Sequence, residues 1–325
     1  MALPLSGPLS LNQIHVEAGG TSGTLCSLNE ADTRSLIDKA VSTQNAISEY
    51  YGASSQVVLT SSGTVNGQDQ RLQIVASDYI SSGGTLNIPS TMWVWSDDTS
   101  VAALTIDIPC TIINDGKIIG KGGQGGNYVG VRATAGGPAI NVTSSGVTIT
   151  NSSGAYIAGG GGGGGYYQDT SNPSDAHAGG GGGAGGGNGG TGRVNQGYWQ
   201  AGVGGELNAS GTDGGNGGDA NNVTGIGGGA GGGGGGQQYG GGGGGRILPG
   251  VGGGQPSGSM RGGSAGNAGY STNNFLSGGG GGWGADGAYG GGTTGTFSDG
   301  GAGGAAIQGT SRTLNNNGTI YGATT

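Results

Sequence analysis

Acidic side chains are the first candidates for chemistry in this sequence, because paired carboxylates can hydrolyse glycosidic bonds. Asp97 and Asp98 are adjacent, so on a strand their side chains would point to opposite faces. Asp169 and Asp175 fall in one loop-like insert and have no evident partner. We therefore predict no catalytic residues, and hydrolysis of a surface polysaccharide is the less favoured alternative.

Histidine and cysteine do not supply a reactive site either. His15 and His177 are the two histidines, and their positions match neither a catalytic triad nor a zinc motif. Cys26 and Cys110 are too far apart in the sequence for a metal motif and form no disulfide framework, so we expect two free thiols. No cofactor and no metal are assigned.

Two short stretches resemble the nonapeptide repeat that binds calcium. GGNGGDANN (214–222) and GGWGADGAY (281–289) match its glycine and aspartate positions, but both fail at the apolar eighth position. Both are also isolated, whereas such sites need stacked neighbours to complete the coordination. Calcium binding at Asp219 or Asp286 is therefore left open.

Glycine dominates the composition: it supplies 90 of the 325 residues, whereas only 9% of residues are charged. A disordered chain would carry more charge, and so few large apolar residues cannot build an ordinary core. The net charge of -8 argues against nucleic acid as a partner, because its binding needs clustered Lys and Arg. No signal peptide or membrane span is evident. We expect an ordered protein made in the cytoplasm, with a scaffold built from backbone.

The glycine-rich block, residues 159–304, alternates glycine runs with inserts. Ordering a residue's backbone costs about 1–2 kcal/mol, and each backbone hydrogen bond contributes about 0.5–1.5 kcal/mol. Order is therefore expected only where many runs pack side by side and pair nearly every peptide group. Polyproline II helices suit such packing, because they have three residues per turn and direct their N–H groups outward. We predict a bundle of packed polyproline II helices.

The inserts between the glycine runs contain most of the aromatic residues of the block. Loops on a rigid scaffold commonly carry binding residues, and aromatic side chains give a large contact area at low entropic cost. A second interpretation is that these rings only cover the ends of the glycine runs. The predicted contact residues are Tyr166, Tyr167, Tyr198, Trp199, Tyr239, Phe275, Trp283 and Tyr289.

Residues 1–55 have an ordinary composition and one predicted helix. Ser27 and Glu30 have the spacing of a capping box, and apolar residues from Leu28 to Val41 approximate a helical stripe. The segment is too short to hold a stable core alone, so we expect it to pack against a partner chain or its own copies.

Residues 56–158 contain short β segments such as RLQIVA, TLNIP, MWVWS and VAALTIDI. Three stretches, beginning at Cys110, Val147 and Arg312, repeat one phrase: Thr, an apolar residue, Asn, a glycine turn, Ile and Gly. Such repetition predicts stacked turns in a β-solenoid-like stem. Because copies lie on both sides of the glycine-rich block, we expect that block to be an insertion and residues 305–325 to complete the stem.

These motifs together resemble those of phage tail proteins. LSLNQIHVEAGGTSGTLCSLNEADTRSLIDKA, followed by YYGASS, is similar to the amino-terminal module of many tailed-phage tail fibre and minor tail proteins. TIINDGKIIGKGGQGGN and the glycine-rich block resemble glycine-rich tail tips, including the distal adhesins of T-even-like long tail fibres. In those adhesins a sandwich of polyproline II helices presents loops to an outer-membrane protein or sugar of the host. Those adhesins are separate proteins that cap a fibre, whereas this chain carries its own attachment module.

The sequence thus predicts a non-enzymatic receptor-binding protein in the virion, at the tail fibre or tail tip. Its fold would be mainly β and irregular, with a small helical virion-attachment module (1–55), a β-solenoid-like stem (56–158 with 305–325) and a polyproline II sandwich with receptor-binding loops (159–304). Expected partners are a host outer-surface protein or glycan and other phage tail proteins, and a homotrimer is one option. The same residues are also compatible with a calcium-stabilised or purely structural tail component, and less well with an ice-binding bundle.

Overall fold

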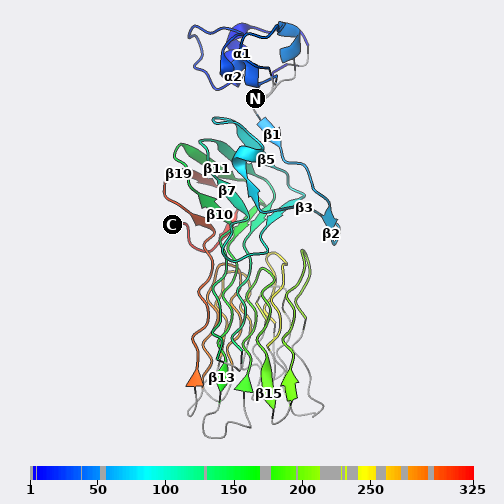
Figure 1. Ribbon diagram of the computed structural model, residues 1–325, viewed down its shortest axis with the longest axis vertical. Helices are drawn as coiled ribbons and strands as arrows, with labels where there is room; N and C mark the ends of the chain where they lie inside the picture. Colours follow the sequence, from blue (N-terminus) through cyan, green and yellow to red (C-terminus); the bar gives the residue numbers. More distant parts are fainter. Residues whose placement is uncertain are drawn as a thin grey trace.

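The computed structural model contains mainly β-strands and few, short helices, as predicted (Figure 1). The residues that the structure describes are 3–4, 6–37, 39–51, 56–127, 130–168, 177–194, 197–212, 228, 231–232, 241–253, 261–271, 277–291 and 296–325. Within these ranges, no helix combines the length and apolar character needed to span a membrane. The molecule is elongated, with the N-terminal helices at one end, the stem in the middle and the glycine-rich bundle at the other end (Figure 1).

The N-terminal module contains three short helices, so the prediction of one longer helix was wrong. They are α1 (Leu11–Glu17), α2 (Ala31–Ser35) and the 3₁₀ helix η1 (Ile47–Tyr50). Helix α1 begins at a complete capping box: the Ser10 hydroxyl accepts from the Gln13 N–H, and the Gln13 side chain accepts from the Ser10 N–H. The S-x-x-Q pattern in the sequence is the signal for this helix.

Helix α2 is short because a tertiary contact forms the turn that follows it. Arg34 is 3% exposed, and its guanidinium donates to the carbonyl of Ala40 and to the hydroxyl and carbonyl of Thr43. These charge-assisted bonds hold the turn against the helix, so the chain does not continue as a helix. Only half of the predicted capping box forms, since Glu30 accepts from the Ser27 N–H at 2.9 Å without the reciprocal bond.

The stem consists of three sheets that the chain visits in the same order, in four complete circuits and a fifth that ends after the second sheet. The first contains β1 (Gln56–Val58), β5 (Thr85–Ile88), β8 (Thr111–Asn114), β11 (Val147–Asn151) and β19 (Arg312–Asn316). The second contains β2 (Thr64–Val65), β3 (Gln68–Leu72), β6 (Met92–Trp95), β9 (Lys117–Ile119), β12 (Tyr156–Ala158) and β20 (Thr319–Tyr321). The third contains β4 (Ile74–Val75), β7 (Leu104–Ile106), β10 (Ile140–Val142) and β18 (Ile307–Gln308), and η2 (Ala76–Asp78) follows β4. All pairings in these sheets are parallel except that of β2 with β3.

Equivalent positions of the repeated phrase stack on one another in this stem. Ile112 pairs with Ile149, which pairs with Leu314, and the apolar side chains of the ladder are directed into the core. The chain leaves the second sheet at Ala158 and enters the third at Ile307. There β18 pairs with β10, and further on β20 pairs with β12, so strands that follow the glycine-rich block lie directly on strands that precede it. Two distant parts of the sequence therefore share one hydrophobic core.

A ladder of asparagines lies at the same turn in the last three circuits. The Asn114 side-chain amide donates to the Asn151 carbonyl oxygen at 2.8 Å, and the Asn151 amide donates to Asn316 at 2.8 Å. Asn114 and Asn151 are fully buried, so stacking lets each buried amide find a partner. The asparagine of the repeated phrase is thus explained by hydrogen bonding between circuits.

In the glycine-rich block, the run 159–165 shows how the segments pack. Its N–H groups donate in rotation to three neighbouring runs, at distances of 2.8–3.0 Å: Gly160 to Gly137 and Gly163 to Thr134, Gly161 to Ala184 and Gly164 to Gly181, Gly162 to Ala285 and Gly165 to Ala288. Every third residue faces the same neighbour. Backbone hydrogen bonds therefore leave each run in three directions, unlike the two directions of a strand within a sheet.

The Cα atoms of the same run face three further neighbours. A Cβ placed on Gly160 would lie 1.9 Å from the Lys121 carbonyl oxygen, and one on Gly163 would lie 1.8 Å from that of Gln124. Equivalent approaches are made to runs 278–281 and 298–304. The run is thus enclosed by six others, and glycine is required here by close packing. Contacts of Cα–H with carbonyl oxygen supplement the N–H bonds.

We expect Gly163→Ala to destabilise the bundle, because the added methyl group would meet a backbone carbonyl that cannot rotate away. Overpacking of this kind costs about 1–3 kcal/mol or more. Thermal unfolding followed by circular dichroism should show a clearly lower Tm. The matched control is Gly291→Ala, where the nearest atom is the side chain of exposed Tyr289 at 3.1 Å and can move. Equal Tm values for the two variants would contradict the packing described.

Candidate functional site

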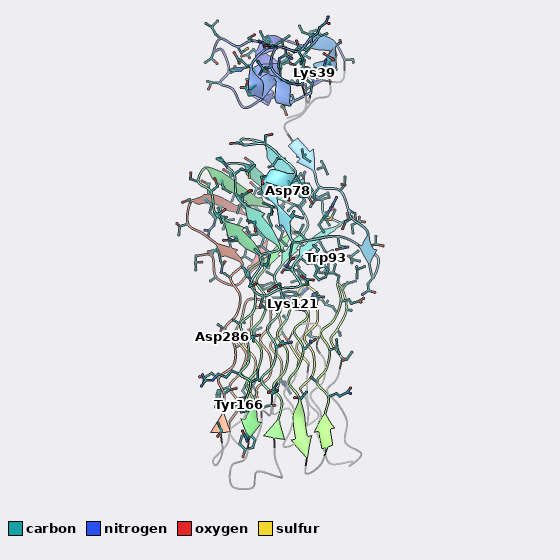
Figure 2. All side chains as sticks on the ribbon, viewed as in Figure 1. Lys39, Asp78, Trp93, Lys121, Tyr166 and Asp286 are labelled. Atoms are coloured by element: carbon teal, nitrogen blue, oxygen red, sulfur yellow. The ribbon has the colours of Figure 1, made fainter. Side chains whose placement is uncertain are left out.

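The glycine-rich bundle has two ends with different properties. Figure 2 shows Trp93 in the stem, Lys121 where the stem meets the bundle, Asp286 partway along it and Tyr166 close to the far end. We call the first end the stem end and the other the distal end. Of the two ends of the described bundle, the distal end faces away from the stem, so it is the candidate surface for binding (Figure 1).

The distal end is organised by a small antiparallel sheet (Figure 1). Its strand order is β16 (Gly197–Trp199), β15 (Gly192–Val194), β14 (His177–Ala178), β13 (Tyr167–Gln168) and β17 (Thr296–Phe297). Strands β13 and β14 are joined by residues 169–176, and β15 and β16 by 195–196, which lie outside the described residues. The sheet fixes where these connections leave the bundle.

Tyr166 and Tyr167 lie at the distal end but are buried in it. Tyr166 is 6% exposed, and its N–H donates to the Ser298 hydroxyl at 3.1 Å. Tyr167 is fully buried and pairs through its backbone with Ala178 and Phe297. Their rings therefore cover the ends of the glycine runs, which is the second role that the sequence left open.

The remaining predicted residues of the bundle lie in several places. Tyr198 and Trp199 belong to β16, an outer strand of the distal sheet. Tyr289 is 47% exposed on the run that leads towards the distal end. Tyr239 and Phe275 fall outside the described residues. Within this set, an exposed side chain is therefore shown for Tyr289.

Trp283 lies at the stem end, away from the other predicted contact residues. It is fully buried in a cluster with Trp93, Ile119 and Leu207, and its indole N–H donates to the Ile247 carbonyl at 2.9 Å. A receptor cannot reach this ring, so its assignment to a contact surface is corrected to a role in joining bundle and stem. The sequence could not separate these roles, because Trp283 is next to glycine in the sequence, as the exposed Tyr270 and Tyr289 are.

The structure exposes one aromatic residue that the site prediction omitted. Tyr270 is 53% exposed, and its N–H donates to the Arg261 carbonyl at 2.7 Å. Its run is bonded to that of Tyr289, since the Gly269 N–H donates to the Asp286 carbonyl. Tyr270 occurs in one of the aromatic-bearing inserts, and this was the available sequence signal.

Two of the aspartates considered above accept hydrogen bonds from nearby backbone groups. Asp98 accepts from both the N–H and the hydroxyl of Ser100 at 2.8 Å, and these bonds lower its carboxyl pKa. Asp286 accepts from the Gly303 N–H at 2.7 Å, so its carboxylate links two glycine runs. Asp169, Asp175 and Asp219 lie outside the described residues. Both cysteines are free, as expected.

Two cations bind the carbonyl groups at the stem end. The buried Arg246 donates to the carbonyls of Gly185 and Gly205, and its guanidinium lies 4.6 Å from the ring centre of Trp95. Lys121 Nζ donates to the Gly186 carbonyl at 2.8 Å. These carbonyls belong to turns between runs, where the lattice of neighbouring glycines ends. Burial, followed by the charge of Arg246, lowers the pKa of Lys121 to about 8.

We expect stability to rise between pH 8 and pH 10 through Lys121. The ordinary pKa of this amine is 10.5, so over this range the unfolded chain holds a proton that the folded protein has released. The cost of the buried charge is fully present below pH 8 and is relieved as pH rises. The measurement is the difference in Tm between wild type and Lys121→Met at several pH values across this range. Other titrating groups affect the Tm of both proteins equally, so their contribution cancels in the difference. A difference that does not change with pH would contradict a buried amine.

These features define an elongated scaffold that presents one end of a backbone-built bundle. A family model described as phage tail fibre adhesin Gp38 matches residues 56–225. That match spans more than half of the chain, and the chain therefore belongs to the phage tail fibre adhesin Gp38 family. It is a virion component located in the tail fibre, and it serves host attachment.

A solved structure described as "Crystal structure of the gp37-gp38 adhesin tip complex of the bacteriophage S16 long tail fiber" is similar to this chain. The identity is 21% and the TM-score is 0.44, with 99% of this chain and 100% of that chain covered. No curated protein matches the sequence.

Proposed function

We propose that the chain is a non-enzymatic receptor-binding protein whose distal loops contact a protein or glycan of the host surface. The observation that carries this proposal is the contrast between the two ends of the bundle. The stem end is closed by buried tryptophans and cations and joins the stem, whereas the described part of the distal end is closed by a small sheet and two buried tyrosines and faces away from the stem. Aromatic side chains of this part of the chain supply contact area without the strong charge that a phosphate ligand would need.

The proposal includes the finer architecture of the scaffold. Three parallel sheets visited in a fixed order support a β-solenoid stem formed by 56–158 and 305–325. Successive N–H groups of the run 159–165 donate to three different neighbouring runs in turn, and the pattern repeats every third residue. This period of three supports polyproline II geometry within 159–304. A run held by six neighbours cannot bend independently. Loops at its end are therefore held in a defined geometry, which limits the entropy lost on binding.

Attachment of the protein to another tail protein is assigned to residues 1–55. The described part of this module buries only Leu3, Ile14 and Tyr50 as a core, with a few partly buried apolar residues around them. Exposed apolar side chains remain, including Leu25 and Val41. So small a core favours a module that gains stability from a partner, and a homotrimer is one such assembly.

The test is to replace residues 169–176 with a Gly/Ser/Asn segment of equal length in the full protein. This exchange retains β13 and β14, because the buried Tyr167 and its pairing are untouched. We expect binding of the purified protein to host cells to be lost, together with its ability to compete with phage adsorption. Unchanged adsorption would show that residues 169–176 do not recognise the receptor. Release of reducing sugar ends from host polysaccharide would favour hydrolysis instead.

A point variant tests the exposed aromatic side of the bundle. We expect Tyr289→Ala to weaken cell binding roughly 5- to 30-fold, the effect of removing about 1–2 kcal/mol of contact energy. The matched control is Val251→Ala, an exposed apolar residue three positions after Leu248, which packs at the stem end. Equal binding by both variants would remove Tyr289 from the contact surface.

A further inference from the structure

The N-terminal module brings together three side chains that can bind a metal ion. His15 of α1, Glu30 at the N-cap of α2 and Asp32 of α2 each offer a ligand atom, and these atoms lie within 4.8 Å of one another. It is the one such group among the residues described. No sequence pattern indicates it, because His15 is separated from the two acids by an intervening turn.

The hydrogen bonds of His15 identify which ring nitrogen is available. Thr24 donates its single hydroxyl hydrogen to the Thr21 carbonyl at 2.7 Å. The hydroxyl oxygen of Thr24, 2.8 Å from His15 Nε2, must therefore accept, so Nε2 carries a hydrogen. In the neutral ring, Nδ1 then presents a lone pair. This arrangement is typical of metal-binding histidines, in which the opposite nitrogen donates to a fixed acceptor.

Nδ1 of His15 is buried and directed towards the acids. The residue is 7% exposed, and Nδ1 has no hydrogen-bond partner. Glu30 Oε2 lies 4.0 Å away, which is too long for a hydrogen bond even if Nδ1 were protonated. The ring is also held in place, because it packs directly on Gly20, where a Cβ would lie 2.2 Å from Cε1. His15 Nδ1 is thus a buried, oriented nitrogen without a hydrogen-bond partner, and it faces the Glu30 carboxylate. A cation bound between these two groups would give both a binding partner.

The spacing fits a first-row divalent ion. Ligand atoms on a tetrahedral ion with bonds of about 2.0–2.2 Å lie about 3.4 Å apart, so His15 Nδ1 and Glu30 Oε2, at 4.0 Å, reach this spacing after a modest movement of the 41% exposed Glu30 side chain. Glu30 keeps its other oxygen on the Ser27 N–H, and Asp32 is anchored by the Thr33 N–H at 2.8 Å. Asp32 is exposed and its ligand atom lies within 4.8 Å of the other two, so rotation of this side chain can complete a three-ligand set.

We propose that His15, Glu30 and Asp32 bind a divalent transition-metal ion, with Zn²⁺ the best match to one imidazole and two carboxylates. Water completes the coordination. The ion joins α1 to the start of α2 and so stabilises a module whose hydrophobic core is very small. Binding to the folded form alone raises stability by mass action. This proposal does not depend on how the distal end recognises its receptor.

The test is calorimetric titration of ZnCl₂ into the full protein after removal of metals with a chelator. We expect one site, with affinity reduced about 10-fold or more in Asp32→Asn and Glu30→Gln and lost in His15→Gln. Asp32→Asn keeps the oxygen that accepts from Thr33, so folding should be retained. The controls are Asp78→Asn, an exposed aspartate of η2, and His177→Gln, the other histidine.

Nuclear magnetic resonance of the His15 ring provides a second readout. Zn²⁺ should shift the Nδ1 resonance while the Nε2–H to Thr24 bond persists, and Co²⁺ in its place should give visible absorption bands. The proposal is overturned if Zn²⁺ binds equally to wild type and Asp32→Asn, if binding follows His177, or if Nδ1 is protonated and unaffected by metal. The last result would identify a simple ion pair with Glu30.

Discussion

The close approach of glycine backbones is the interaction on which the rest of the structure depends. The central run 159–165 uses N–H groups towards three neighbours and Cα–H groups towards three others, so the peptide unit itself replaces the side-chain core. Because carbonyl oxygens occupy the places of its absent Cβ atoms, the packing tolerates no side chain there. Side chains are consequently confined to the two ends and the outer surface of the bundle. The residues that can contact other molecules are thus separate from those that form the packed interior.

The two ends then acquire different roles. At the stem end, buried aromatic rings and the cations Lys121 and Arg246 satisfy the carbonyl groups where the lattice stops. The cost of burying these charges appears as depressed pKa values, and it is compensated by hydrogen bonds that turn carbonyls would otherwise lack. At the distal end, Tyr166 and Tyr167 cover the runs from which the connecting segments leave. An adhesin can therefore vary its distal connections without changing the packed interior.

The stem explains how such an insertion is tolerated. The chain leaves the second sheet at β12 and returns to the third at β18, so the glycine-rich block takes the place of an ordinary turn between the second and third sheets within one circuit. The hydrogen-bonded ladder of Asn114, Asn151 and Asn316 joins circuits on both sides of the insertion, and its first two members are buried. The block is anchored by its stem end as well as by its two chain connections, which gives a rigid attachment.

The sequence alone determined the class of structure, since the glycine-rich composition predicts a scaffold built from backbone and the repeated Thr-apolar-Asn phrase predicts stacked circuits around the hydrophobic core of the stem. It also located the aromatic inserts. What only the tertiary structure decided is which end of the bundle each aromatic reaches: Trp283 and Tyr289 have similar glycine-rich surroundings, yet one is buried and the other exposed. The N-terminal helices were misjudged for a related reason, because Arg34 and Thr43 end α2 through a tertiary contact. Local pattern specifies backbone geometry, whereas direction and burial follow from neighbours that are distant in the chain.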